Sequence, residues 1–291
     1  MNNKKYFLIL FFLLTCVYSF SQTLDNVQFP SNIKWKQIET KYFVLIFPEE
    51  LSDQAKDFAT LVDACYPADS MSLGVKAKKK WPIIINNTLS ESNGYVASAP
   101  EFSELYSITP QTGFLGSGTW FPALCSHEIR HIMQNEKIQR GFTAFSGWIF
   151  GNYGTSITSH FALPSWVWEG DAVLTETLLS SQGRGRMAQF ERGLRTNTLN
   201  GVRSGYDKSS LGTYGSYNKR VQSWYVMGYH LTTYIRQNYG IDGYNKILEI
   251  SGNFSCMPLI LNIAVKHVTG KSLKLMAYMR NFLIFQEFSH V

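Results

Sequence analysis

Leu124-Cys125-Ser126-His127-Glu128-Ile129-Arg130-His131 decides the fold, because this stretch contains the pattern H-E-x-x-H. Two histidines four residues apart lie on one face of a helix, so the imidazoles of His127 and His131 can reach one metal ion. Glu128 would then lie beside the ion, where a carboxylate can act as general base on water at the metal. The pattern is short, and the alternative is a surface helix with scattered His and Glu residues.

The surrounding residues predict that this helix is buried. Thr119 is a natural N-cap, and Pro122 is tolerated in the first turn of a helix. Large apolar residues occur along the helix: Trp120, Leu124, Ile129, Ile132 and Met133. Two histidines and a glutamate in such a helix would be costly without partners, so burial favours metal ligation.

A catalytic zinc ion takes three protein ligands and leaves one position for water. A third histidine at the metzincin spacing would fall at Lys137, and the glycine of that motif at Gln134, which excludes that class. The next candidate is Glu169, in the second turn of a helix that Ser165 is expected to cap. Thirty-seven residues separate His131 from Glu169, enough for the first helix to end, a loop to cross and a second helix to return.

The segment that holds this glutamate carries a specific resemblance. Trp166-x-x-Glu169-Gly170-x-Ala172 after an H-E-x-x-H resembles the gluzincin clan of zinc metallopeptidases. The aminopeptidase-N-like members of that clan have W-x-x-E-G-x-A, and its glutamate is their third ligand. The resemblance therefore implies that His127, His131 and Glu169 hold Zn²⁺.

The carboxylate that would support a metal histidine is not where thermolysin-type enzymes have it. Those enzymes place an acid four residues after the ligand glutamate, and Val173 stands at that position. A ligating histidine donates its second N–H to an acceptor, and Asp171 and Glu176 are the remaining candidates. We prefer Glu176, two turns after Glu169 on the same face, although either acid could simply be solvated.

A further helix motif lies downstream. Ser223-Trp224-Tyr225-Val226-Met227-Gly228 opens a helix that is predicted to continue to Gly240. Aminopeptidase-N-like enzymes have Y-x-x-G at the corresponding place, which implies that the Tyr225 hydroxyl points at the scissile carbonyl and stabilises the developing oxyanion. Tyr229, four residues later on the same face, is the alternative, and most of the 16 tyrosines are expected only to pack.

The residues before the metal helix predict a small sheet. Residues 42–47 and 82–86 are apolar runs typical of strands, and a helix from Ser52 to about Cys65 is expected to back them. A turn and a short strand follow in Ser92-Asn93-Gly94-Tyr95-Val96-Ala97-Ser98-Ala99-Pro100. This strand is either an ordinary sheet edge or an edge that binds an extended peptide through Asn93, Gly94, Tyr95, Val96 and Ala97.

Two basic segments have simple explanations. The run Lys76, Lys78, Lys79 and Lys80 is expected to be a solvated loop, and no helix-turn-helix or RNA-binding signature accompanies it. We therefore expect no nucleic-acid partner. Gly183-Arg184-Gly185-Arg186 is either a loop in which Arg184 and Arg186 bind a substrate carboxylate, or a surface turn, which we favour slightly.

The first residues have the pattern of a secretory signal. Lys4 and Lys5 precede an apolar run over residues 6–18, and Ser19-Phe20-Ser21 supplies small residues for cleavage before Gln22. The run is shorter than the ~20 residues of a membrane span. We predict export to the periplasm, the outer envelope or the extracellular space. The mature cysteines Cys65, Cys125 and Cys256 do not suggest a disulfide framework, although one bridge is allowed.

The order of these segments over residues 35–285 resembles exported peptidase-MA-like proteins of Bacteroidetes. The resemblance implies an α+β, thermolysin-like gluzincin domain over residues 22–291, after a signal peptide over residues 1–21. Its small N-terminal mixed sheet lobe would cover about 30–135 and its C-terminal helical lobe about 136–288. A β-propeller commonly follows in those relatives, and no blade repeats occur here, so a truncated copy is one expectation.

These observations predict zinc-dependent hydrolysis of a peptide or protein, with Glu128 as general base. The aminopeptidase-N-like enzymes capture the substrate amine with a G-x-M-E-N strand, which residues 92–96 do not match, so an endopeptidase is favoured. One alternative is a non-catalytic, metal-stabilised interaction module associated with the cell envelope. Another is a non-peptide hydrolase on the same scaffold, because a fold does not fix its substrate.

Overall fold

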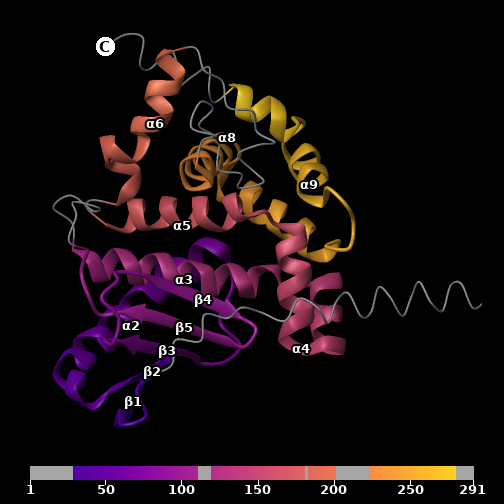
Figure 1. Cartoon of the computed structure of the whole chain (residues 1–291). Coiled ribbons are helices and arrows are strands. Elements are labelled where there is room, and N and C mark those ends of the chain that lie inside the picture. The colour runs from indigo at the N-terminus through magenta and orange to yellow at the C-terminus, as the bar shows by residue number, and fades with distance from the viewer. Residues whose placement is uncertain (1–28, 111–118, 181–182, 201–222, 280–291) are drawn as a thin grey trace, which may run out of the picture. The chain divides into compact units, whose positions relative to one another are not determined.

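Strands from the first third of the chain form one mixed sheet (Figure 1). The computed structural model describes residues 29–110, 119–180, 183–200 and 223–279. The strands are β1 (Trp35–Glu39), β2 (Phe43–Pro48), β3 (Trp81–Asn86), β4 (Gly94–Ser98) and β5 (Glu101–Tyr106), in the order β1-β2-β3-β5-β4. β3 is parallel to both of its neighbours, whereas β1 pairs with β2 and β4 with β5 in antiparallel fashion. β4 is therefore an edge strand, and the sequence did not predict β5.

Helix α2 (Ser52–Leu73) packs against β2 and α3, and its Phe58 and Val62 belong to the shared hydrophobic core. It is longer than predicted, because it continues through Pro67 to bury Tyr66 and Leu73. Ser52 is also not the N-cap that we expected, since the cap position is Leu51 and the Ser52 hydroxyl donates to the Glu49 carbonyl. Burial of the second half of α2 outweighs the hydrogen bond that a proline removes from a helix.

Helices form the rest of the described chain (Figure 1). They are α3 (Trp120–Ile138), α4 (Gly141–Ala162), α5 (Ser165–Leu179), α6 (Ala188–Leu199), α8 (Trp224–Asn253) and α9 (Ile260–Thr269), with short 3-10 turns η1 (Glu49–Leu51) and η2 (Arg184–Arg186). Residues 273–279 are helical as well. α3 lies between the sheet and α5, and α8 packs on α5. The structure thus confirms the α+β class, with a mixed sheet on the N-terminal side and a mostly helical remainder.

Several local predictions need correction. A loop was expected between the two candidate metal helices, but α4 fills that interval. Thr119 is the N-cap of α3 without a capping hydrogen bond from its side chain, and Pro164 rather than Ser165 occupies the N-cap of α5. Ser223 does cap α8, because its hydroxyl accepts a bond from the Tyr225 N–H. The predicted signal peptide lies outside the described residues. Among the residues that the structure describes, no helix is long and apolar enough to span a membrane.

The crossing of α5 and α8 depends on two glycines. Gly170 of α5 lies against Gly228 of α8, and a Cβ atom at Gly170 would stand 2.1 Å from the Gly228 carbonyl carbon. A Cβ at Gly228 would stand 2.1 Å from the Trp166 carbonyl oxygen. The backbones can approach this closely only without side chains. The glycines of the W-x-x-E-G-x-A and Y-x-x-G motifs therefore fix how these two helices meet.

A buried charge cluster holds α2, α3 and α5 together. Arg130 is fully buried and donates from Nε and Nη2 to the two oxygens of Asp171, at 2.7 and 3.0 Å. Its Nη1 lies 3.3 Å from Asp69 Oδ1 on α2. Such a bidentate pair offsets the large cost of desolvating the charges, and removal of one partner costs about 3–5 kcal/mol. Burial raises the pKa of Asp69 to about 7, although Arg130 acts in the opposite direction.

Gly228→Ala is expected to destabilise the protein by about 3 kcal/mol or more, because the new methyl group would collide with backbone that cannot move aside. The control is Gly193→Ala on α6, where no atom lies within 4 Å of the new Cβ. The Gly193→Ala change is expected to raise the free energy of unfolding by roughly 0.5–1 kcal/mol. Thermal and denaturant unfolding of the two variants would measure the difference, and equal stabilities would contradict the close crossing.

Asp69→Asn is expected to remove a pH dependence of stability. The folded-state pKa of Asp69 is raised from 3.8 to about 7, so the folded state keeps a proton that the unfolded state releases. Wild-type stability should therefore fall, relative to the variant, as the pH rises from about 4 to about 8, by on the order of 4 kcal/mol. Urea unfolding across this range would measure it, with the exposed Asp53→Asn as control. If the difference in unfolding free energy between wild type and Asp69→Asn did not change with pH, the raised pKa of Asp69 would be refuted.

Candidate metal centre

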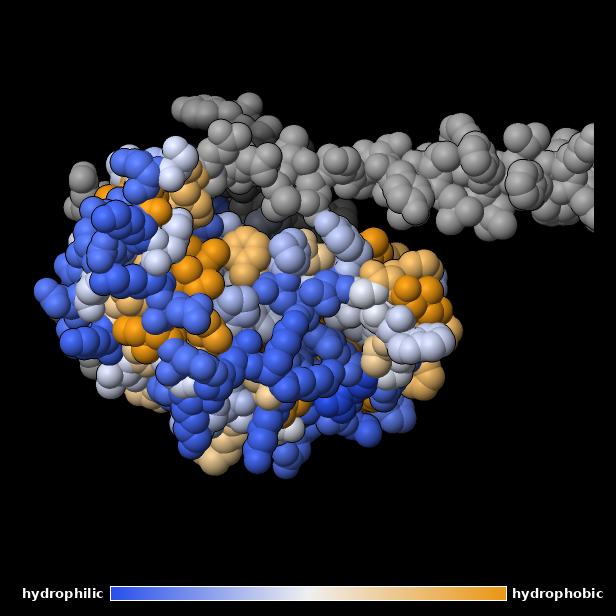
Figure 2. Space-filling view, turned by 90° about the horizontal axis from the view of Figure 1, so that it is seen from below, coloured by the Kyte–Doolittle hydropathy of each residue, from blue (hydrophilic) through white to orange (hydrophobic). Residues whose placement is uncertain are grey.

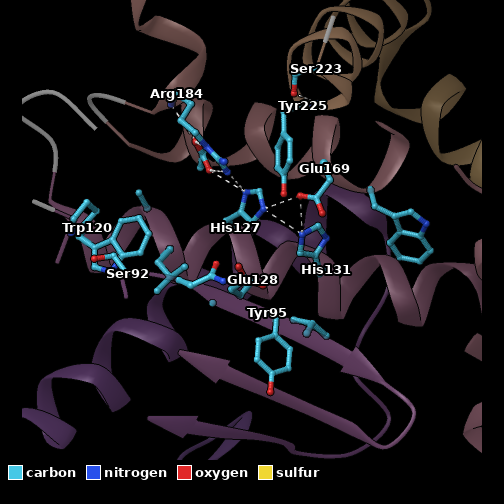
Figure 3. Close-up of a pocket in the computed structure, with 18 of the residues that line it drawn as sticks. Ser92, Tyr95, Trp120, His127, Glu128, His131, Glu169, Arg184, Ser223 and Tyr225 are labelled. Atoms are coloured by element: carbon cyan, nitrogen blue, oxygen red, sulfur yellow. Dashed lines mark hydrogen bonds and ion pairs between the residues drawn. The ribbon is translucent and has the colours of Figure 1, made fainter. Parts of the chain in front are cut away.

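Three side chains from α3 and α5 converge on one point (Figure 3). The Nε2 atoms of His127 and His131 are 3.2 Å apart, and they lie 3.2 and 3.5 Å from Glu169 Oε2. His127 and His131 share a face of α3, as their spacing predicts, and Glu169 comes from the second turn of α5. These three residues form a group that can bind a metal ion.

The three separations fit a tetrahedral ion. Ligand atoms held about 2.0–2.1 Å from a tetrahedral metal lie roughly 3.3–3.4 Å from one another. Two nitrogen donors and one carboxylate oxygen are also a donor set that zinc accepts, and they leave the fourth position open. Both the chemistry and the geometry of the group therefore suit a catalytic zinc ion.

The electrostatics of the pocket favour a cation. Its walls carry the carboxylates of Glu128, Glu169 and Glu176 and the guanidinium of Arg184, so these groups have a formal charge of −2 when both histidines are neutral. Burial opposes protonation of His131, but Glu169 raises its pKa to about 9. Burial likewise disfavours ionised Glu169, yet His131 and His127 hold its pKa far below the usual range. A divalent ion would replace the proton on the histidine and neutralise the excess negative charge of the pocket.

Glu128 lies in the same pocket but outside the ligand group. Its carboxylate is buried, and no described residue hydrogen-bonds its Oε2 atom. Burial raises the pKa of this carboxyl group. The β4 backbone passes close to it, because a Cβ at Gly94 would stand 3.3 Å from Glu128 Oε1. The pocket therefore holds a basic carboxylate with a free acceptor atom beside the converging ligands.

Glu176 supports His127 from the far side of the ring. Its Oε2 atom lies 2.9 Å from His127 Nδ1, which leaves Nε2 to face the ligand group. The Arg184 guanidinium binds Glu176 with Nε and Nη2, both at 2.7 Å, and also lies 2.7 Å from His127 Nδ1. Burial raises and Arg184 lowers the pKa of Glu176, to a net value of about 2. This carboxylate is therefore a permanent acceptor for the histidine.

The structure places the two arginines of η2 in different surroundings. Arg184 lines the pocket, where its guanidinium binds Glu176. Arg186 lies outside the pocket and donates to the carbonyls of Thr177 and Ser180. The sequence did not suggest that the basic segment folds back onto α5.

Gln134 supports His131, a role that the sequence reasoning missed. Its Oε1 atom lies 2.8 Å from His131 Nδ1, and its Nε2 donates to Asp171 Oδ2 at 3.0 Å. Asp171 itself contacts neither histidine and is engaged by Arg130. Gln134 stands three residues after His131, one turn along the same helical face, and that spacing is the signal that would have identified it.

Tyr225 and Tyr229 lie in different places. Tyr225, from the first turn of α8, lines the pocket and points its hydroxyl toward the ligand group (Figure 3). Burial and the neighbouring Glu169 raise the pKa of this phenol, so it is a neutral donor. Tyr229 instead points at η2, with its hydroxyl 3.4 Å from the Gly185 carbonyl oxygen.

The pocket opens along the edge strand β4. It has a volume of about 1060 Å³, and Asn93, Gly94, Tyr95 and Val96 form one wall, whereas Ala97 does not line it. The Tyr95 ring points away from the ligand group, because its hydroxyl donates to Glu104 Oε2 at 2.5 Å (Figure 3). His160 of α4 and Trp168 of α5 also line the pocket. The pocket is large enough for several residues of an extended chain.

Comparisons with known proteins add little to this geometry. No protein-family model matches the sequence, and no curated protein matches it. A solved structure of an aminopeptidase N family protein from Idiomarina loihiensis is similar at 12% identity and a TM-score of 0.35. The match covers 88% of this chain and 41% of that protein, so the chain spans less than half the length of that relative.

Proposed function

We propose that the protein is a zinc metallopeptidase that cleaves peptide bonds by hydrolysis. The convergence of His127 Nε2, His131 Nε2 and Glu169 Oε2 beside the unpaired Glu128 carboxylate carries this proposal. A zinc ion in this group would activate water and polarise a carbonyl group as a Lewis acid. The supporting contacts of Glu176 and Gln134 would keep the two imidazoles aligned as ligands.

In this mechanism Glu128 moves the proton. Its raised pKa suits a general base near neutral pH, and its free Oε2 atom is available to accept a proton from the attacking water. The carboxyl group would then protonate the leaving amine. Tyr225 would donate a hydrogen bond to the oxyanion as negative charge develops on the carbonyl oxygen.

The β4 edge supports a peptide as substrate. Residues of β4 line the pocket, and β4 pairs only with β5 among the described strands, so its other edge can accept an added strand. Backbone hydrogen bonds of this kind tolerate varied side chains. Because residues 92–96 present no acidic side chain within the strand itself to bind a substrate amine, we propose an endopeptidase. Export to the envelope or beyond remains our prediction from residues 1–21.

Glu128→Gln is expected to retain zinc and to lose hydrolysis by about 10²–10⁴-fold, because the amide cannot accept the proton of water. His131→Ala should lose the zinc itself, since one of three ligands is removed. Metal content by mass spectrometry and turnover of a broad peptide library would measure both effects. Wild-type rates in Glu128→Gln would refute the mechanism, and zinc without any wild-type turnover would favour the non-catalytic module.

Tyr225→Phe is expected to lower kcat by about 10²-fold with little change in KM, because the phenol acts on the charge of the transition state. Tyr229→Phe is the matched control, since this hydroxyl faces η2 rather than the pocket. Steady-state kinetics on a peptide that the wild type cleaves would measure both. Equal activity of Tyr225→Phe and wild type would exclude the oxyanion role.

A further inference from the structure

Helix α4 is a hairpin with an uncharged, apolar surface. Its 22 residues contain no Asp, Glu, Lys or Arg. Gly151 has φ 61° and ψ −151°, which breaks the helix into two arms. The arms pack closely through small residues, because a Cβ at Gly154 would stand 2.2 Å from the Ser146 carbonyl oxygen, and one at Gly147 would stand 2.4 Å from Thr155 Oγ1.

Large apolar side chains cover the outside of this hairpin. Phe142, Phe145 and Trp148 form a row on the first arm, with ring centroids 6.1 and 6.3 Å apart. Tyr153, Ile157 and Phe161 follow at four-residue spacing on the second arm, and all three are exposed. Figure 2 shows apolar residues gathered at the right-hand end of the coloured surface, the side on which α4 lies in Figure 1. Exposed patches of this kind mark interaction surfaces.

The tip of the hairpin identifies the kind of partner. Trp148, Ile149 and Phe150 are consecutive, and their exposed fractions are 82%, 47% and 67%. Consecutive helical residues point about 100° apart, so the tip is apolar on several sides at once. A protein surface would cover one side of such a tip, whereas a fluid apolar medium contacts all of them. Trp and Tyr are also the residues that favour the boundary between lipid and water.

A second apolar element adjoins the base of the hairpin. Thr143 donates to the Gly252 carbonyl at 3.1 Å and lies 2.8 Å from Ser255 Oγ, which anchors α4 to the end of α8. The turn that follows α8 exposes Phe254 and Leu259. Leu259 is 76% exposed and has φ 59°, an unfavourable backbone conformation for leucine. The apolar surface therefore extends from the hairpin onto this turn.

We propose that the α4 hairpin inserts into the interfacial region of a lipid bilayer and docks the protein on a membrane surface. Each arm has about ten residues and is roughly 15 Å long, too short to cross a hydrocarbon core of about 30 Å. The hairpin thus enters one leaflet, to the depth of about 5–10 Å typical of interfacial helices. Because the Ser156 hydroxyl contacts Ser98 of β4 and His160 lines the pocket, docking would hold the metal pocket close to the membrane.

The test uses the full chain with vesicles of phosphatidylcholine that carry a photoactivatable acyl chain. Peptide mapping by mass spectrometry locates the crosslinks, so contacts of residues 141–162 are distinguished from those of the apolar residues 6–18. We expect crosslinks at Trp148 and Phe150. The double variant Trp148→Ser, Phe150→Ser should lose them and bind vesicles at least about tenfold more weakly. Both side chains are exposed, so the fold should be retained.

The control variant is Met71→Ser on α2, which removes an equally exposed apolar side chain elsewhere and should bind vesicles like the wild type. Crosslinks confined to residues outside 141–162 would overturn the proposal. Unchanged vesicle binding by the double variant would also overturn it. A third contrary result would be a wild-type dimer, measured by sedimentation, that the double variant dissociates, because the hairpin would then bind a second copy of the chain.

Discussion

The structure depends on the burial of charged and polar side chains in one helix. Residues 123–138 of α3 are buried apart from His131, and they include His127, Glu128, Arg130 and Gln134. An unpaired buried charge costs several kcal/mol. The neighbouring helices supply partners for His127, Arg130 and Gln134, namely Asp69 from α2 and Glu169, Asp171 and Glu176 from α5, whereas the Oε2 atom of Glu128 has none among the described residues. These contacts with the buried groups of α3 therefore hold α2 and α5 in position, and α5 carries Glu169 and Glu176 of the pocket.

Residues of the H-E-x-R-H stretch belong to two networks of side-chain contacts. His127 and His131 face the pocket with Glu169, whereas Arg130 binds Asp171 and Asp69. The two networks meet at Gln134, which contacts both His131 and Asp171. The pair formed by Arg130 and Asp171 fixes α3 against α5, so it also sets the distance between the histidines and Glu169. Structural stability and the geometry of the candidate metal site are thus linked through one helix pair.

The sequence predicted those features that depend on local spacing. The histidine spacing on α3 follows from helical periodicity, and the start of α8 directly after Ser223 agrees with the predicted helix opening. Glu169 on α5 was predicted through the resemblance of its segment to the W-x-x-E-G-x-A motif. β5 was not predicted, because its residues Glu101–Tyr106 include two glutamates and alternate poorly. The length of α2 was underestimated, since Pro67 suggested an end that tertiary burial overrides.

Long-range contacts explain the remaining differences. Nothing in the local sequence shows that Arg184 binds Glu176, eight residues earlier, because the contact depends on the packing of η2 against α5. The meeting of Gly170 with Gly228 likewise joins residues 58 positions apart, and it is visible only when α5 and α8 are placed together. The sequence predicts a loop where the α4 hairpin lies, because the glycines and serines of this segment are typical of loops.

The central claim is that His127, His131 and Glu169 bind one zinc ion. The most direct measurement is an anomalous difference map at the zinc absorption edge, from crystals of the protein purified with zinc. The account predicts a strong peak about 2.0–2.2 Å from His127 Nε2, His131 Nε2 and Glu169 Oε2. A map without a peak between these three atoms, from crystals whose zinc content is proven, would contradict it.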